Sequence, residues 1–340
     1  ATGVVSLYTV TFACRSIYHF AFFGPVPTFL LMGLITAAAF LLAVRLEAQV
    51  VAVLGILGGF LTPLLVSTGQ NNPLALFGYI ALLDFGLIAV ALHRRWHYLV
   101  PLGAVGTVLM QIGWAAKFLS AESAVTAIVI CLGSAALFLG AAVLARRRGA
   151  GAREFTWAAI LLPLVAFGFA LVFLRLPEIA ARPGLLFTFV LLADACLLVV
   201  AWCDEEWPKL HLVAGTVVFV LLAAWTSGRL TAPLLPWALA FYLLHAVLHT
   251  AFPLLLERHR PAAAPTWWSQ LFPPMALVLL LLPLFQLKEL SLLFWPCVLL
   301  VDLLAIGLAL LTASLAAVGA VLVLTLVATG VWVFQIPATV

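Results

Sequence analysis

The chain has 340 residues, of which 66% are hydrophobic and 8% are charged, and its formal net charge is +4. A typical soluble domain has about 25% charged residues, so this chain has too little polar surface to coat a globule in water. The composition excludes a soluble enzyme, a nucleic-acid-binding module, a disordered tail and a secreted disulfide scaffold. The excess of Lys and Arg requires no nucleic-acid partner, because the cytoplasmic loops of membrane proteins are basic.

Thirteen apolar runs follow one another along the chain, separated by Pro, Gly or charged residues. About 20 apolar residues cross a bilayer core of roughly 30 Å as a helix. Continuous runs favour helices over the alternating strands of a β-barrel, so the predicted fold class is all-α integral membrane. The predicted helices cover residues 3–23, 26–44, 48–67, 73–92, 97–119, 123–145, 155–174, 183–203, 209–227, 232–256, 271–287, 291–311 and 313–335.

The loops differ in charge, and this difference predicts an orientation. Loops after even-numbered helices hold ten basic residues: Arg45, Arg94, Arg95, Arg146, Arg147, Arg148, Arg153, Lys209, Arg258 and Arg260. Loops after odd-numbered helices hold five: Lys117, Arg175, Arg182, Arg229 and Lys288. By the positive-inside rule the even loops are cytoplasmic, so the start of the chain is inside and its end outside. The chain begins without Met and without a basic leader, so we expect a fragment of a longer protein.

No motif of an enzyme or a cofactor site is found in the sequence. The five cysteines lie in or beside apolar runs without a CxxC pair, which is typical of packing residues rather than disulfides or metal ligands. We find no nucleophile elbow, phosphate loop, glycosidase carboxylate pair or zinc ligand set. We therefore predict no catalytic residue, no metal and no cofactor, and a membrane enzyme is the least favoured class.

An internal repeat of about 110 residues carries four markers: an aromatic residue, an Asp seven residues later, then a Thr and a Trp. These are Phe77, Asp84, Thr107 and Trp114; then Phe187, Asp194, Thr216 and Trp225; then Trp295, Asp302, Thr325 and Trp332. A repeat of four helices returns the chain to the same side, so the repeats are parallel. We expect one membrane domain over 1–340, with repeat pairs around 73–119, 183–227 and 291–335.

The three Asp–Thr pairs are the main candidate site. Each Asp lies near the middle of its predicted helix, where a charged Asp costs about 2.5–3.5 kcal/mol, and the Thr of the next helix lies at a similar depth. In one interpretation the carboxyl group, neutral when desolvated, hydrogen-bonds the Thr hydroxyl and stabilises the hairpin by about 1 kcal/mol. In the other, the Asp binds a cation or relays protons in a polar cavity.

His245 and His249 are weaker candidates for a polar or ion site. They lie four residues apart, on one face of a predicted helix. Two histidines at this spacing need further ligands to hold a metal, and no acidic residue lies within one helical turn. A packed pair is the simpler interpretation.

The stretch GGFLTPLLVSTGQNNPLALFGYIALLDFG at 58–86, followed by ALHRRW at 91–96, resembles a bacterial family of predicted membrane proteins, domain of unknown function 2339. The resemblance implies a many-helix protein of the bacterial inner membrane, with no established activity and no catalytic residue to transfer. Two functions stay open. One is a transporter or channel in which the Asp–Thr pairs line a path for protons or cations. The other is a non-catalytic membrane scaffold for envelope assembly, with the lipid bilayer as its one predicted partner.

Overall fold

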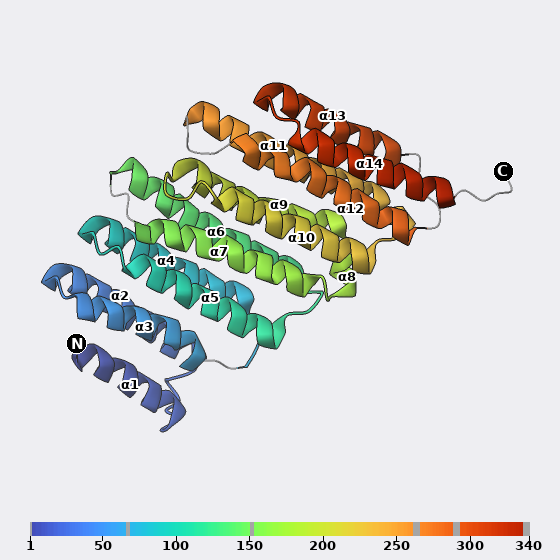
Figure 1. Cartoon of the computed structure of the whole chain (residues 1–340). Helices are drawn as coiled ribbons and strands as arrows, with labels where there is room; N and C mark the ends of the chain where they lie inside the picture. Colours follow the sequence, from blue (N-terminus) through green and yellow to red (C-terminus); the bar gives the residue numbers. More distant parts are fainter. Residues whose placement is uncertain (1, 66–68, 150–152, 261–265, 288–292, 336–340) are drawn as a thin grey trace. The chain divides into compact units, whose positions relative to one another are not determined.

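The computed structural model describes residues 2–65, 69–149, 153–260, 266–287 and 293–335, and every regular element in these ranges is helical (Figure 1). The predicted all-α class is therefore confirmed for the described residues. The chain forms two compact units, Ala1–Val165 and Ala166–Val340, and the boundary between them falls inside helix α7.

The first unit is built from antiparallel helix hairpins. In it α2 packs against α3, and α4 packs against α5 and α6. Its helices are α1 (Thr2–Ser16), α2 (Pro25–Leu46), α3 (Gln49–Leu65), α4 (Pro73–Arg94), α5 (Leu99–Phe118), α6 (Ala124–Arg147) and the first part of α7 (Arg153–Phe173).

The second unit repeats this mode of packing, with α9 against α10, α11 against α10 and α12, and α13 against α14. It contains the rest of α7, α8 (Pro177–Ala180), α9 (Pro183–Cys203), α10 (Leu210–Arg229), the 3₁₀ helix η1 (Ala232–Leu234), α11 (Leu235–His259), the 3₁₀ helix η2 (Thr266–Leu271), α12 (Phe272–Gln286), α13 (Phe294–Thr312) and α14 (Ala316–Gln335).

Eleven helices of the described residues are long and apolar enough to cross a membrane. They correspond to eleven of the thirteen predicted runs. The run 3–23 forms the shorter helix α1 with 15 residues. In the run 48–67 the described part of α3 has 17 residues, and the end of the run lies outside the described residues. At about 1.5 Å per residue α1 rises ~23 Å, less than the roughly 30 Å hydrocarbon core. The apolar run 3–23 overestimates the length of α1, because the backbone turns after Ser16 and His19 has a positive φ of 50°.

Local sequence signals explain where the hairpin helices begin and end. Pro73 and Pro183 stand at the first position of α4 and α9, where the missing N–H costs nothing. Asn72 caps α4, because its Oδ1 accepts a hydrogen bond of 3.2 Å from the Ala75 N–H. The α4–α5 connection begins at Arg95, whose φ of 59° lies in the left-handed region that ends many helices. These boundaries hold successive helices in tight antiparallel hairpins.

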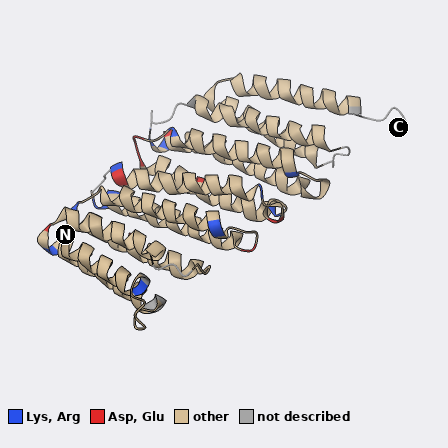
Figure 2. Cartoon of the chain, turned by 90° about the horizontal axis from the view of Figure 1, so that it is seen from below, with Lys and Arg blue, Asp and Glu red and all other residues tan. Residues whose placement is uncertain are grey.

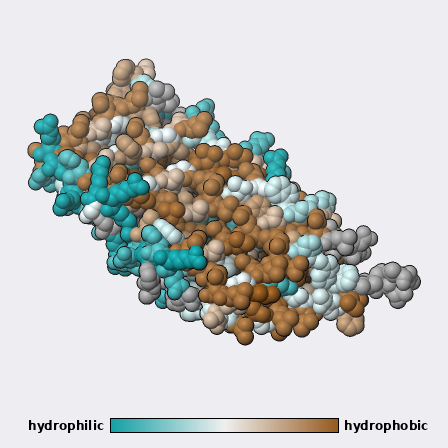
Figure 3. Space-filling view, turned by 90° about the horizontal axis from the view of Figure 1, so that it is seen from above, coloured by the Kyte–Doolittle hydropathy of each residue, from teal (hydrophilic) through white to brown (hydrophobic). Residues whose placement is uncertain are grey.

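The outer surface is typical of a protein solvated by lipid. Large apolar side chains are widely exposed, among them Leu74 (81%) and Leu310 (83%), and hydrophobic residues cover much of the face in Figure 3. Lys and Arg lie mainly at helix ends and in connections (Figure 2). Charge is therefore concentrated where a spanning helix meets the headgroups.

Candidate functional site

Two of the three predicted Asp–Thr pairs are in contact. In the α4–α5 hairpin the Thr107 hydroxyl donates to Asp84 Oδ2 over 2.5 Å. In the α13–α14 hairpin the Thr325 hydroxyl donates to Asp302 Oδ1 over 2.8 Å. Asp84 is 1% exposed, whereas Asp302 is only partly buried. The two pairs thus form the same kind of hydrogen bond, but Asp84 is more deeply buried than Asp302.

The third pair is not formed, because Asp194 contacts a histidine instead. His249 Nε2, on α11, lies 3.1 Å from Asp194 Oδ2, and both side chains are fully buried. Thr216 is exposed on α10. Its separation from Asp194 is 22 residues instead of the 23 of the other pairs. One residue turns a helical side chain by about 100°, which is enough to move Thr216 off the contact face.

A glycine makes the approach of His249 possible. A Cβ atom at Gly215 of α10 would lie 2.9 Å from His249 Nδ1 and 2.5 Å from Phe272 Cε1. The ring of His249 stacks on that of Phe272, with centroids 4.9 Å apart. Residues of four helices, α9 to α12, therefore meet around His249.

Three fully buried histidines belong to this region, and one of them was missed in the sequence. His245 Nδ1 donates to the Phe241 carbonyl oxygen at 2.9 Å, and the His245 and His249 rings lie 6.3 Å apart. His211, at the start of α10, donates from Nδ1 to the Pro208 carbonyl at 3.1 Å. A carbonyl oxygen only accepts, so Nδ1 carries the proton in the neutral form of each of these two rings. Nε2 is then the nitrogen with the free lone pair. His211 escaped attention because it lies beside a predicted loop and has no partner at helical spacing.

In the first unit Asp84 and Thr107 lie on the floor of a crevice of about 260 Å³ between α4, α5 and α6. Gln111 is one turn beyond Thr107 on α5, and its Nε2 donates to Ser134 Oγ on α6 over 2.8 Å. Ser134 in turn donates to the Cys131 carbonyl. Gln111 and Ser134 were not predicted, although the spacing of Thr107 and Gln111 places both on one helix face.

The aromatic markers of the repeat also meet across the hairpins. Each first aromatic residue packs edge-to-face against the Trp of the next helix: Phe77 with Trp114 (5.8 Å, 90°), Phe187 with Trp225 (5.5 Å, 87°) and Trp295 with Trp332 (5.3 Å, 79°). Two of these indoles donate to the residues that precede the hairpin. Trp114 Nε1 bonds Asn71 Oδ1 at 2.9 Å, and Trp225 Nε1 bonds the Ala180 carbonyl at 2.7 Å.

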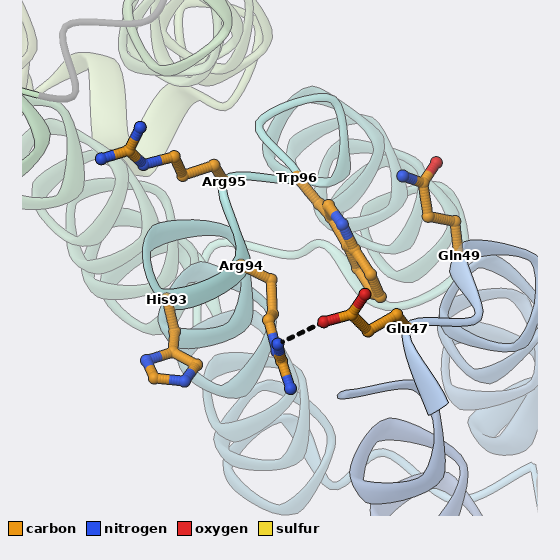
Figure 4. Close-up of a pocket in the computed structure, with 6 residues that line it drawn as sticks. All are labelled: Glu47, Gln49, His93, Arg94, Arg95 and Trp96. Atoms are coloured by element: carbon orange, nitrogen blue, oxygen red, sulfur yellow. Dashed lines mark hydrogen bonds and ion pairs between the residues drawn. The ribbon is translucent and has the colours of Figure 1, made fainter. Parts of the chain in front are cut away.

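A separate polar pocket lies where α2 and α4 end (Figure 4). Arg94 Nη1 and Glu47 Oε1 form an ion pair of 2.9 Å across it, and Arg94 also donates to the Val44 carbonyl. Figure 4 shows Arg95 pointing away from this pair. Because Glu47 is 74% exposed, the ion pair contributes at most about 1 kcal/mol and joins two helix ends.

No group of three His, Cys, Asp or Glu side chains within the described ranges is arranged to hold a metal ion. The five cysteines are free thiols. The polar chemistry described in the helices therefore consists of small pairs of carboxyl, imidazole, amide and hydroxyl groups.

The family assignment rests on a match over just over half of the chain. Residues 1–181 match the family described as Predicted membrane protein (DUF2339), and the chain belongs to this family. The resemblance is thus confirmed, and the apolar helices are those of a membrane protein. No curated protein and no solved structure matches the chain.

Proposed function

We propose that this member of the predicted membrane protein family moves protons across the bilayer through ionisable side chains buried in its helices. The contact between Asp194 and His249 carries the proposal. An ionisable side chain within a membrane helix is costly, and it usually marks an ion pathway or a proton relay. Here two such groups lie within ion-pair distance in a fully buried setting.

A carboxyl–imidazole pair is suited to holding and releasing a proton. Imidazole changes charge near neutral pH, and a neighbouring carboxylate stabilises its protonated form. His245 on α11 and His211 on α10 are two further fully buried imidazoles of this unit. A Thr hydroxyl, as in the other hairpins, would hold the carboxyl group but could not accept its proton.

The remaining predicted residues are proposed to have lesser roles. Asp84 with Thr107 and Asp302 with Thr325 form further polar positions, and Thr216 contributes nothing to the Asp194 centre. The proposed arrangement is thirteen helices in parallel four-helix repeats, in a bacterial inner membrane with the start of the chain inside. The edge-to-face aromatic pairs at equivalent positions of three hairpins support the repeat.

Proton flux into proteoliposomes with an internal pH dye tests this function. We expect flux in the wild type and a fall of about tenfold or more in Asp194→Asn, because general acid–base groups contribute about 10²–10⁴-fold to proton transfer. Asn keeps the size of the side chain but cannot carry the proton. Glu122→Gln, which removes an exposed loop carboxylate, is the matched control and should behave as the wild type. A folded wild type without flux would overturn the proposal.

A membrane scaffold is the second candidate, and the two Asp–Thr hydrogen bonds favour it. They pair the Thr hydroxyls within single hairpins and need no ion to explain them. Under this alternative no flux is measured in any variant, and Asp194→Asn lowers only the melting temperature.

A further inference from the structure

The crevice between α4, α5 and α6 holds a buried carboxyl group, and none of its described lining residues is basic. Among the described residues that line it, Asp84 is the one ionisable side chain, and the other polar ones are Thr107, Gln111 and Ser134. The rest of the lining is apolar or glycine. In such surroundings the carboxyl group is either protonated or paired with a positive ion, because burial of an unpaired charge is costly.

Two oxygen atoms in this crevice have no hydrogen-bond partner among the described residues. These are Asp84 Oδ1 and Gln111 Oε1, and their side chains are 1% and 2% exposed. The local donors are already engaged, since Thr107 donates to Asp84 Oδ2 and Gln111 Nε2 donates to Ser134. What remains is one carboxylate oxygen and one amide oxygen, both acceptors.

A proton on Asp84 Oδ1 would neutralise the carboxyl group and turn this oxygen into a donor, which would then serve Gln111 Oε1 directly or through a water molecule. A proton alone, however, leaves the volume of about 260 Å³ unfilled. A water molecule takes up about 30 Å³ in the liquid, so a cation with part of its hydration shell fits.

We propose that the crevice binds a monovalent alkali cation, with the oxygens of Asp84 and Gln111 as ligands, directly or through water. One carboxylate balances one positive charge, and hard cations prefer carboxylate, amide and hydroxyl oxygens. Ca²⁺ sites, by contrast, gather six to eight oxygens, usually with several carboxylates. That the bound cation is coupled to proton movement rests on the proposed function, but its binding does not.

Polar groups extend from the crevice toward the end of α5. Gln111 follows Thr107 by one turn, and Trp114, three residues further, is bonded to Asn71 just before α4. From Gln111 to the last residue of α5, Phe118, the helix rises about 10 Å. These groups give a cation a partly polar route from the α5–α6 loop.

Thermal unfolding of the full chain in detergent tests the site, with NaCl compared against N-methylglucamine chloride at equal ionic strength. We expect a saturable rise of the wild-type melting temperature in Na⁺. Asp84→Asn keeps an oxygen toward Thr107 but removes the charge. The half-saturating Na⁺ concentration should therefore rise about tenfold or more, which corresponds to the loss of one charged ligand contact. Glu47→Gln removes an exposed carboxylate of the same unit and should respond as the wild type.

Gln111→Met gives a second and independent variant, because Met fills a similar volume without an amide oxygen. It should also weaken the response to Na⁺, and it carries the test if Asp84→Asn does not fold. Equal melting temperatures in the two salts, or an undiminished response in both variants, would overturn the site. Proton flux without stabilisation by Na⁺ would refute this inference alone, whereas stabilisation without flux would refute the proposed function alone.

Discussion

Gly215 is the residue on which the buried Asp194–His249 contact depends. The histidine ring and the ring of Phe272 occupy the space that any side chain at position 215 would need. Neither ring can move freely, because both are fully or almost fully buried. The absence of a side chain at position 215 of α10 thus lets the carboxyl group of α9 meet an imidazole of α11.

Gly215→Ala tests this dependence. The added methyl group forces His249 and Phe272 to shift, and overpacking of this kind lowers the free energy of unfolding by about 1–3 kcal/mol. Gly228→Ala on the same helix is the control, because a Cβ atom there meets no atom within 4 Å. Urea or thermal unfolding in detergent should show a loss of stability for Gly215→Ala and no loss for Gly228→Ala. Equal stabilities would contradict the packing described here.

The Asp–Thr hydrogen bonds make a second prediction at the scale of residues. Thr107→Val keeps the shape of the side chain but removes the donor to a buried carboxyl group, so it should destabilise by about 1–3 kcal/mol. Thr325→Val should cost less, since Asp302 is partly exposed and finds other solvation. The two melting temperatures, measured in the same detergent, give the comparison. A larger loss in Thr325→Val would contradict it.

The hairpin is the element in which the sequence pattern acts. In each of three hairpins an aromatic residue near the start of one helix meets a Trp near the end of the next, edge to face. Such aromatic pairs contribute about 0.5–1.5 kcal/mol beyond the area that they bury. In two hairpins the indole also donates to the segment before the first helix, so it closes the open end of the hairpin.

Trp225 is the most buried of these indoles, at 0% exposure. Trp225→Phe removes the donor to the Ala180 carbonyl and should lower stability by about 1 kcal/mol. Trp225→Ala also removes the ring and should cost about 3–5 kcal/mol. Trp332→Ala is the comparison, because that residue is 36% exposed and should cost less. If the Trp332→Ala variant were less stable than the Trp225→Ala variant, the result would contradict this difference in burial.

At the scale of the molecule, the distribution of charge predicts an orientation of the helices in the membrane. The long α6, with 24 residues, ends at a run of three Arg residues and begins beyond a loop that carries Glu122. A helix of this length rises about 36 Å, so its ends lie on opposite sides of a bilayer. The positive-inside rule predicts that the Arg end is cytoplasmic.

Cysteine labelling tests the orientation in a chain whose five cysteines are replaced by Ala. A membrane-impermeant maleimide applied to right-side-out vesicles should modify Glu122→Cys but not Arg148→Cys. Inverted vesicles should give the opposite pattern. Labelling of both sites from one side would exclude α6 as a spanning helix, and the reversed pattern would reverse the predicted orientation.

The sequence by itself determined the membrane class, the family and most helix boundaries. These depend on local features: apolar runs of sufficient length, and Pro, Gly or charge between them. It also predicted which Asp and Thr residues meet in two hairpins, since residues at matching distances from a tight turn lie at the same depth. The length of α1 escaped it, because apolar composition does not mark where the backbone turns after Ser16.

Only the tertiary structure decided what each buried carboxyl group contacts. Asp194 meets His249 from α11, and Asp84 shares a crevice with Gln111 and with Ser134 of α6. Helices that are apolar on every side carry no amphipathic pattern to indicate which face turns inward. Their rotation about their own axes follows from side-chain packing, such as the space left by Gly215, and this rotation assigns the partners of each polar group.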